Sequence, residues 1–60
     1  MMQKPSDDQI FKAIRDVAAS VGYGSKTKVI RLVHLRLLPQ GVTLSDVDRV
    51  WQNRVEVAGP

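Results

Sequence analysis

The sequence predicts an all-α fold, a three-helix bundle formed by residues 1–60 as one small domain. Two capping boxes, starting at Ser6 and Thr43, indicate helix starts. In such a box a hydroxyl accepts a hydrogen bond from a free backbone N–H, and a side chain three residues later reaches back. Between these signals, apolar residues recur every three or four positions, and glycine or proline interrupts the pattern twice.

The first helix is predicted over about residues 7–21. Ser6 and Gln9 form its capping box, and two aspartates in the first turn complement the helix dipole. Gly22 is expected to end the helix. The core-facing stripe consists of Ile10, Ile14, Val17, Ala18 and Val21, with Phe11 and Ala13 beside it.

The second helix is predicted over about residues 26–38, with Ser25 as its cap and Pro39 as its stop. Its apolar face is formed by Val29, Ile30, Val33 and Leu37. Three further leucines fall outside that face: Leu32, Leu35 and Leu38. Either the helix is buried over much of its circumference, or some of these leucines contact a partner subunit.

The third helix is predicted over about residues 44–55. One side gathers the apolar residues Leu44, Val47, Val50, Trp51 and Val55, and the other gathers Ser45, Arg49, Gln52 and Asn53. Trp51 is therefore expected in the core, where an aromatic side chain contributes a large share of the buried area. The tail from residue 54 to residue 60 is compatible with a short C-terminal strand or with an unstructured end.

Charge is distributed unevenly along the chain. The net charge is +3, and all of it comes from residues 25–60, because cations and acids balance in residues 1–24. No acid occurs between Ser25 and Val42. This asymmetry indicates a polyanionic partner, although a solvated basic surface would have the same composition.

Several functional classes are excluded by composition. The chain has no cysteine, so it has neither a disulfide framework nor a thiolate metal site, and it suits a reducing cytoplasm. No apolar run reaches membrane-span length. The lone histidine, His34, has no carboxylate one helical turn away, and no phosphate loop or catalytic triad spacing is present. We therefore expect a cytoplasmic protein that is not an enzyme and has no cofactor, metal, membrane or small-molecule partner.

The junction of the second and third helices resembles a known motif. Gly41-Val42-Thr43, followed by Val47 and Val50, resembles the turn and recognition-helix start of helix-turn-helix DNA-binding domains. The glycine permits the positive φ of the turn, and the apolar residues hold the two helices at a fixed angle. The resemblance covers about residues 29–54.

Upstream of the glycine the sequence departs from the motif. Pro39 and Gln40 occupy positions normally at the end of the first motif helix, and Leu37 replaces the usual small residue. This favours a looser turn, as in winged-helix relatives. The order of three helices, with a basic second helix and a late tryptophan, is also similar to the N-terminal DNA-binding domain of KfrA-type plasmid proteins.

The resemblance implies sequence-specific binding of double-stranded DNA by a small prokaryotic, phage or plasmid transcriptional regulator. The third helix would lie in the major groove, where arginine, asparagine and glutamine hydrogen-bond base edges, while cations of the second helix contact phosphates. A homodimer is expected, since a two-fold site doubles the contacts. The predicted DNA-binding residues are Lys26, Thr27, Lys28, Arg31, Thr43, Ser45, Arg49, Gln52 and Asn53.

Two alternatives remain open. In a second register the motif would run from Val17-Gly22 into residues 25–31, so that the more basic second helix would contact the bases. In a second functional class the chain is a protein-interaction adaptor or antitoxin-like assembly partner that uses its outlying leucines.

Overall fold

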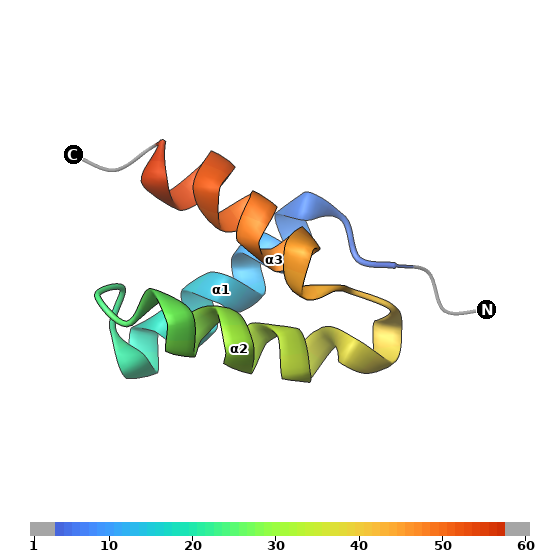
Figure 1. Cartoon of the computed structure of the whole chain (residues 1–60), viewed down its shortest axis with the longest axis horizontal. Helices are drawn as coiled ribbons and strands as arrows, with labels where there is room; N and C mark the ends of the chain where they lie inside the picture. Colours follow the sequence, from blue (N-terminus) through green and yellow to red (C-terminus); the bar gives the residue numbers. More distant parts are fainter. Residues whose placement is uncertain (1–3, 58–60) are drawn as a thin grey trace.

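The computed structural model describes residues 4–57, which form three α-helices and two short helical extensions (Figure 1). They are α1 (Asp7–Val21), α2 (Lys26–Leu37), the 3-10 turn η1 (Leu38–Gln40), α3 (Leu44–Val50) and the π-helical η2 (Trp51–Glu56), which continues α3. No strand occurs within the described part of the chain, which confirms the all-α, three-helix prediction. None of these helices is long and apolar enough to cross a membrane.

The tail differs from both alternatives predicted for it. Residues 54–56 belong to η2, so they form neither a strand nor an unstructured end. The backbone N–H of Val57 donates to the carbonyl of Gln52 at 3.2 Å, which is the wide hydrogen-bond spacing of a π-helix. The rest of the predicted tail, residues 58–60, lies outside the described residues.

Two of the three predicted helix caps are confirmed. The Ser6 hydroxyl accepts from the Gln9 N–H at 3.3 Å, and the Gln9 side chain accepts from the Ser6 N–H at 3.1 Å. Thr43 and Asp46 form the same pair of bonds at 3.1 and 3.0 Å. Ser25 precedes α2 but its hydroxyl makes no capping bond. Its ψ of 58° is not the extended conformation that would bring the hydroxyl to the first helical N–H groups.

Both helix ends follow from glycine and proline. Gly22 closes α1 with a φ of 95°, and Gly41 follows η1 with a φ of 84°, both in the positive range that favours glycine. α2 ends at Leu37, one residue earlier than predicted, because Pro39 lies in the tighter turn of η1. The connection between α2 and α3 therefore spans residues 38–43.

The core lies where the three helices meet. Its buried side chains are Ile10, Ala13, Ile14, Ala18, Val29, Ile30, Val33, Leu37, Val42, Val47, Val50 and Trp51. Trp51 is only 3% exposed, which confirms its predicted place in the core. Leu44, which was predicted on the apolar side of the third helix, is not part of the core. It is 48% exposed, because it is the first residue of α3 and lies at the edge of the apolar face, beside α2.

The three outlying leucines of α2 and η1 are exposed. Leu32, Leu35 and Leu38 are 40%, 62% and 52% accessible. The buried residues of α2 are limited to Val29, Ile30, Val33 and Leu37. The interpretation that α2 is buried over much of its circumference is therefore wrong.

The burial of Trp51 predicts a large effect of its removal. We expect Trp51→Ala to lower the free energy of unfolding by about 3 to 5 kcal/mol, the cost of truncating a large core aromatic. For so small a domain this is enough to populate the unfolded chain. Circular dichroism during urea titration measures the change.

Tyr23→Ala is the matched control. The Tyr23 ring lies 6.2 Å from the Trp51 ring, centroid to centroid, but the side chain is exposed. Its loss should cost much less than the loss of Trp51. A Trp51→Ala protein as stable as Tyr23→Ala would contradict the assignment of Trp51 to the core.

Candidate nucleic-acid interface

The polar face of α3 forms an ion pair with α1 and is therefore not free. One terminal nitrogen of Arg49 lies 2.8 Å from Asp7 Oδ1, at the start of α1, and the other lies 3.1 Å from Asp46 Oδ1. The hydrogen bond that Arg49 donates to Asp7, with the smaller contribution of Asp46, raises the pKa of the Arg49 guanidinium. The residue expected to contact base edges therefore links two helices of its own chain.

Asp46 is the centre of this arrangement. Its side chain is buried, and it accepts hydrogen bonds from the Thr43 N–H and from Arg49 while Lys4 Nζ lies 2.7 Å away. The Lys4 ammonium, followed by the Thr43 backbone N–H, lowers the pKa of the Asp46 carboxyl far below its ordinary value. The predicted DNA contact Thr43 thus serves as the cap of α3, with its hydroxyl bonded to the Asp46 N–H.

A second group of contacts joins the start of α2 to α3 and η2. Lys26 Nζ lies 2.9 Å from Glu56 Oε1 and 3.7 Å from Asp48 Oδ1. The hydrogen bond that Lys26 donates to Glu56 raises the pKa of Lys26. The Gln52 amide donates to Asp48 at 3.1 Å, so a further predicted base contact is bonded within α3 and η2.

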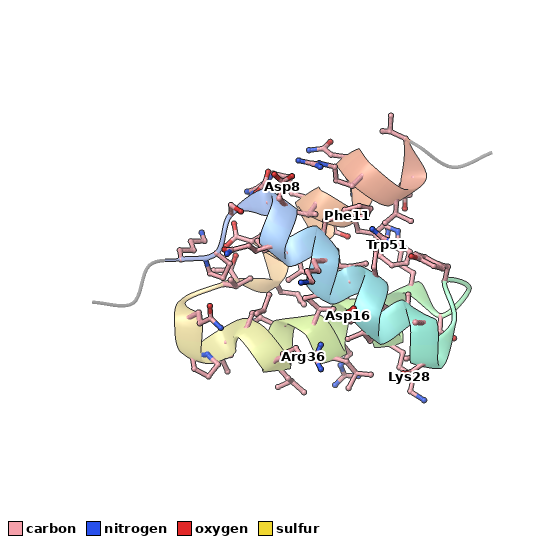
Figure 2. The ribbon with its side chains drawn as sticks, turned by 180° about the vertical axis from the view of Figure 1, so that it is seen from behind. Asp8, Phe11, Asp16, Lys28, Arg36 and Trp51 are labelled. Atoms are coloured by element: carbon pink, nitrogen blue, oxygen red, sulfur yellow. The ribbon has the colours of Figure 1, made fainter. Side chains whose placement is uncertain are left out.

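The end of η2 is tied back to α1. Arg54 lies 2.8 Å from Asp8 Oδ1. Its guanidinium and that of Arg15 each lie 5.9 Å from the centroid of the Phe11 ring, within cation–π distance. Figure 2 shows Asp8 and Phe11 on the part of α1 that faces η2.

The other cations of α2 differ from Lys26 because they form no ion pair among the described residues. Lys28, Arg31 and Arg36 are exposed, and within residues 4–57 no acid lies within ion-pair distance of any of them. Lys28 and Arg36 both project from α2 in Figure 2. Arg36 was not predicted as a binding residue. The absence of any acid between Ser25 and Val42, which extends from residue 17 to residue 45, was the signal for it.

The ion pairs divide the molecule into two electrostatic parts. The α3 ion pairs, in which every pair includes a residue of α3 or η2, comprise four cations and five acids and carry a formal charge of −1. Five cations and one acid, Asp16, remain outside these ion pairs. All six lie on α1 and α2, and their formal charge is +4. The members of this basic part are Lys12, Arg15, Lys28, Arg31 and Arg36.

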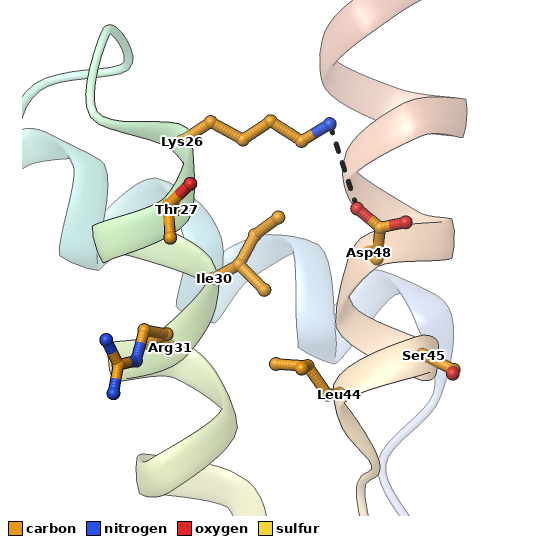
Figure 3. A pocket seen from close by; sticks show the side chains of 7 residues that line it. All are labelled: Lys26, Thr27, Ile30, Arg31, Leu44, Ser45 and Asp48. Atoms are coloured by element: carbon orange, nitrogen blue, oxygen red, sulfur yellow. Dashed lines mark ion pairs between the residues drawn. The ribbon is translucent and has the colours of Figure 1, made fainter.

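An open groove runs between α2 and α3 (Figure 3). Ile30 and Leu44 form its apolar floor, and the Lys26–Asp48 ion pair crosses one end. A smaller hollow on α2 shares Thr27 and Arg31 with this groove. The lining residues of the groove are Lys26, Thr27, Ile30, Arg31, Leu44, Ser45 and Asp48.

The structure thus brings together only part of the predicted site. Lys26, Thr27, Arg31 and Ser45 line one groove, and Lys28 lies beside them on α2. Arg49, Gln52 and Thr43 are bonded within the chain, and Asn53 is exposed on η2 without a side-chain hydrogen bond to the described residues. The contact between Asp46 and Arg49 could be predicted from the sequence, because the two residues are three apart on one helix. The contact between Arg49 and Asp7 could not, because these residues are far apart in the sequence.

Comparisons with protein-family models, with curated proteins and with solved structures found no match to this chain. The described residues also contain no group of three metal-ligating side chains.

The lowered pKa of Asp46 predicts how stability depends on pH. A carboxyl with a lower pKa in the folded than in the unfolded chain stabilises the fold above its unfolded pKa. That contribution is lost as the pH falls toward the folded value. We expect Asp46→Asn to be less stable than the native chain at neutral pH, and the difference to shrink below about pH 4.

Urea midpoints at neutral and acid pH test this expectation. Asp16→Asn is the matched control, because Asp16 is an exposed helical aspartate with no ion pair among residues 4–57. It should leave the midpoint nearly unchanged at both pH values. Equal midpoints for native and Asp46→Asn chains at neutral pH would contradict the proposed role of the Asp46 contacts.

Proposed function

We propose that the chain binds double-stranded DNA through the exposed basic face of α2, as a small transcriptional regulator of a bacterium, phage or plasmid. The regulatory role rests on the resemblance to helix-turn-helix domains. We choose α2 as the binding surface because its cations Lys28, Arg31 and Arg36 are free within residues 4–57, whereas the cations around α3 are paired with acids.

Free cations favour a polyanion partner for a simple reason. A lysine or arginine already paired with a carboxylate must give up that partner to meet a phosphate, whereas an unpaired one exchanges only water and counterions. Lys28 and Arg31 are one helical turn apart and lie on the exposed side of α2. Together they form a short cationic strip on a helix that is narrow enough for the major groove.

The neighbouring polar groups suit the same ligand. Thr27 on α2 and Ser45 on α3 line the groove beside Arg31, and both hydroxyls are exposed. Hydroxyl side chains commonly hydrogen-bond phosphate oxygens, while an arginine can bond two atoms of a guanine edge. In this proposal Lys28 contacts phosphate, Arg31 contacts a base edge, and Thr27 and Ser45 position the helix.

The proposal differs from the expectation that the third helix reads the bases. To do so, Arg49 would have to leave both Asp7 and Asp46, and Gln52 would have to leave Asp48. The two liberated acids beside Arg49 would then repel the DNA backbone. The second register, in which α2 follows the turn at Gly22, avoids this cost.

A protein-interaction adaptor is the second candidate function. It is favoured by one observation, the exposure of Leu32, Leu35 and Leu38 on α2 and η1. Exposed leucines in a row indicate a protein contact rather than a nucleic-acid contact. Binding that weakens steeply with salt distinguishes the DNA-binding proposal from this one.

Paired substitutions provide the sharpest test. Lys28→Gln and Lys26→Gln remove the same charge from the first turn of α2, but only Lys26 is engaged with acids of its own chain. We expect Lys28→Gln to weaken binding to a labelled duplex and to reduce the salt slope by about 1, and Lys26→Gln to change both much less. Fluorescence anisotropy from about 50 to 200 mM salt measures both quantities.

Arg31 and Arg49 form a second matched pair. Arg31→Gln should cost about 1 to 3 kcal/mol on the preferred sequence and relax the preference at one base position. Arg49→Gln should leave DNA affinity unchanged in protein shown to be folded. The reverse pattern would favour α3 as the helix that contacts the bases. If the native chain shows no salt-dependent binding to DNA, the protein-interaction adaptor is the better supported function.

A further inference from the structure

The exposed leucines of α2 and η1 are spaced evenly along the chain about a central residue, Leu35. Leu32 and Leu38 each lie three residues from Leu35, on either side of it along α2 and η1. All three are at least 40% exposed, and Leu35, the middle one, is the most exposed at 62%. Leu35 lies on the side of α2 opposite its buried residues, and Leu32 and Leu38 lie on either side of it. All three stay exposed among residues 4–57.

We infer that this row is the contact surface for a second copy of the chain, with the two α2 helices antiparallel and crossing at Leu35. A two-fold interface must be self-complementary, so that a residue contacting a second residue is also contacted by it. In an antiparallel crossing at Leu35, Leu32 of each copy lies opposite Leu38 of the other. The spacing of the leucines satisfies this requirement without any change in the fold.

The distribution of charge selects the antiparallel orientation. Lys28 and Arg31 lie on the N-terminal side of Leu35, whereas its C-terminal side carries one cation, Arg36, followed by the uncharged residues 39–42. A parallel pair would place Arg31 against Arg31 and Lys28 against Lys28, which is repulsive. An antiparallel pair places these cations opposite the uncharged turn of the other copy.

The same symmetry has a consequence for DNA binding, and this step rests on the proposed function. The two-fold axis of an antiparallel helix pair is perpendicular to the plane of the two helices. Side chains that lie to one side of the contact, such as Thr27 and Arg31, therefore lie on the same side of the pair in both copies. The dimer presents two grooves, each with its own Thr27 and Arg31, to one ligand.

The size of the contact predicts a weak dimer. Stable protein interfaces bury at least about 1,200 Å², and a single crossing of two twelve-residue helices provides less. We therefore expect the free chain to associate only at high concentration, on the order of hundreds of micromolar.

Cysteine cross-linking of the full chain, without DNA, tests both the contact and its orientation. The chain has no cysteine, so a single introduced thiol is specific. In Leu35→Cys the two Cα atoms at the crossing come within disulfide range, about 4.4 to 6.8 Å. In Lys28→Cys the two equivalent positions are separated by about 20 Å along the helices. We expect Leu35→Cys to oxidise to a covalent dimer and Lys28→Cys to stay monomeric under the same oxidant.

The other outcomes overturn the inference. Equal cross-linking of both variants would show a parallel pair or random collision, and no cross-linking of either would show that the face does not bind a second copy. Sedimentation provides an independent measurement: Leu35→Gln should abolish concentration-dependent association, and Leu44→Gln, at a similarly exposed leucine outside the row, should not. Because DNA is absent from both experiments, failure of the dimer leaves the anisotropy test of DNA binding unaffected.

Discussion

The rest of the structure depends on the buried carboxylate of Asp46. It caps α3 through the Thr43 N–H, accepts from Arg49, and lies against Lys4 from the segment before α1. A buried charge is costly unless its hydrogen bonds are satisfied, and here three donors surround it. Two of those donors belong to α3 and its cap, and the third belongs to the segment before α1. One side chain therefore fixes the start of α3, the direction of Arg49 and the position of the segment leading into α1.

The electrostatic character of the surface follows from that constraint. Once Arg49 is held by Asp46 and Asp7, and Lys26 and Arg54 by acids of their own, the polar side of α3 and η2 is nearly neutral. The excess positive charge of the chain then belongs to α1 and α2. Lys28 and Arg31 share one hollow with Leu32 and Leu35, so binding of a polyanion and pairing of two copies would use adjoining surfaces of the same helix.

The fold was largely predictable from sequence because its signals are local. The capping boxes at Ser6 and Thr43 and the glycine at residue 41 act over three or four residues, and the apolar stripes of α1 and α2 have the period of the helix. Ser25 failed as a cap because its conformation is set by the preceding turn. The site was less predictable: Arg49 and Asp7 are 42 residues apart, and only the packing of α3 on α1 brings them together.

Chemical-shift mapping with mixed-sequence duplex DNA shows which helix binds DNA, because it locates the contact surface without knowledge of the preferred sequence. If the ion pairs leave α2 as the binding helix, the amide shifts should concentrate between Ser25 and Leu35, with a smaller response at Ser45 in the adjoining groove. They should also diminish as salt is added. Shifts concentrated instead between Asp46 and Asn53, on the polar side of α3 and η2, would show that α3 rather than α2 contacts the DNA.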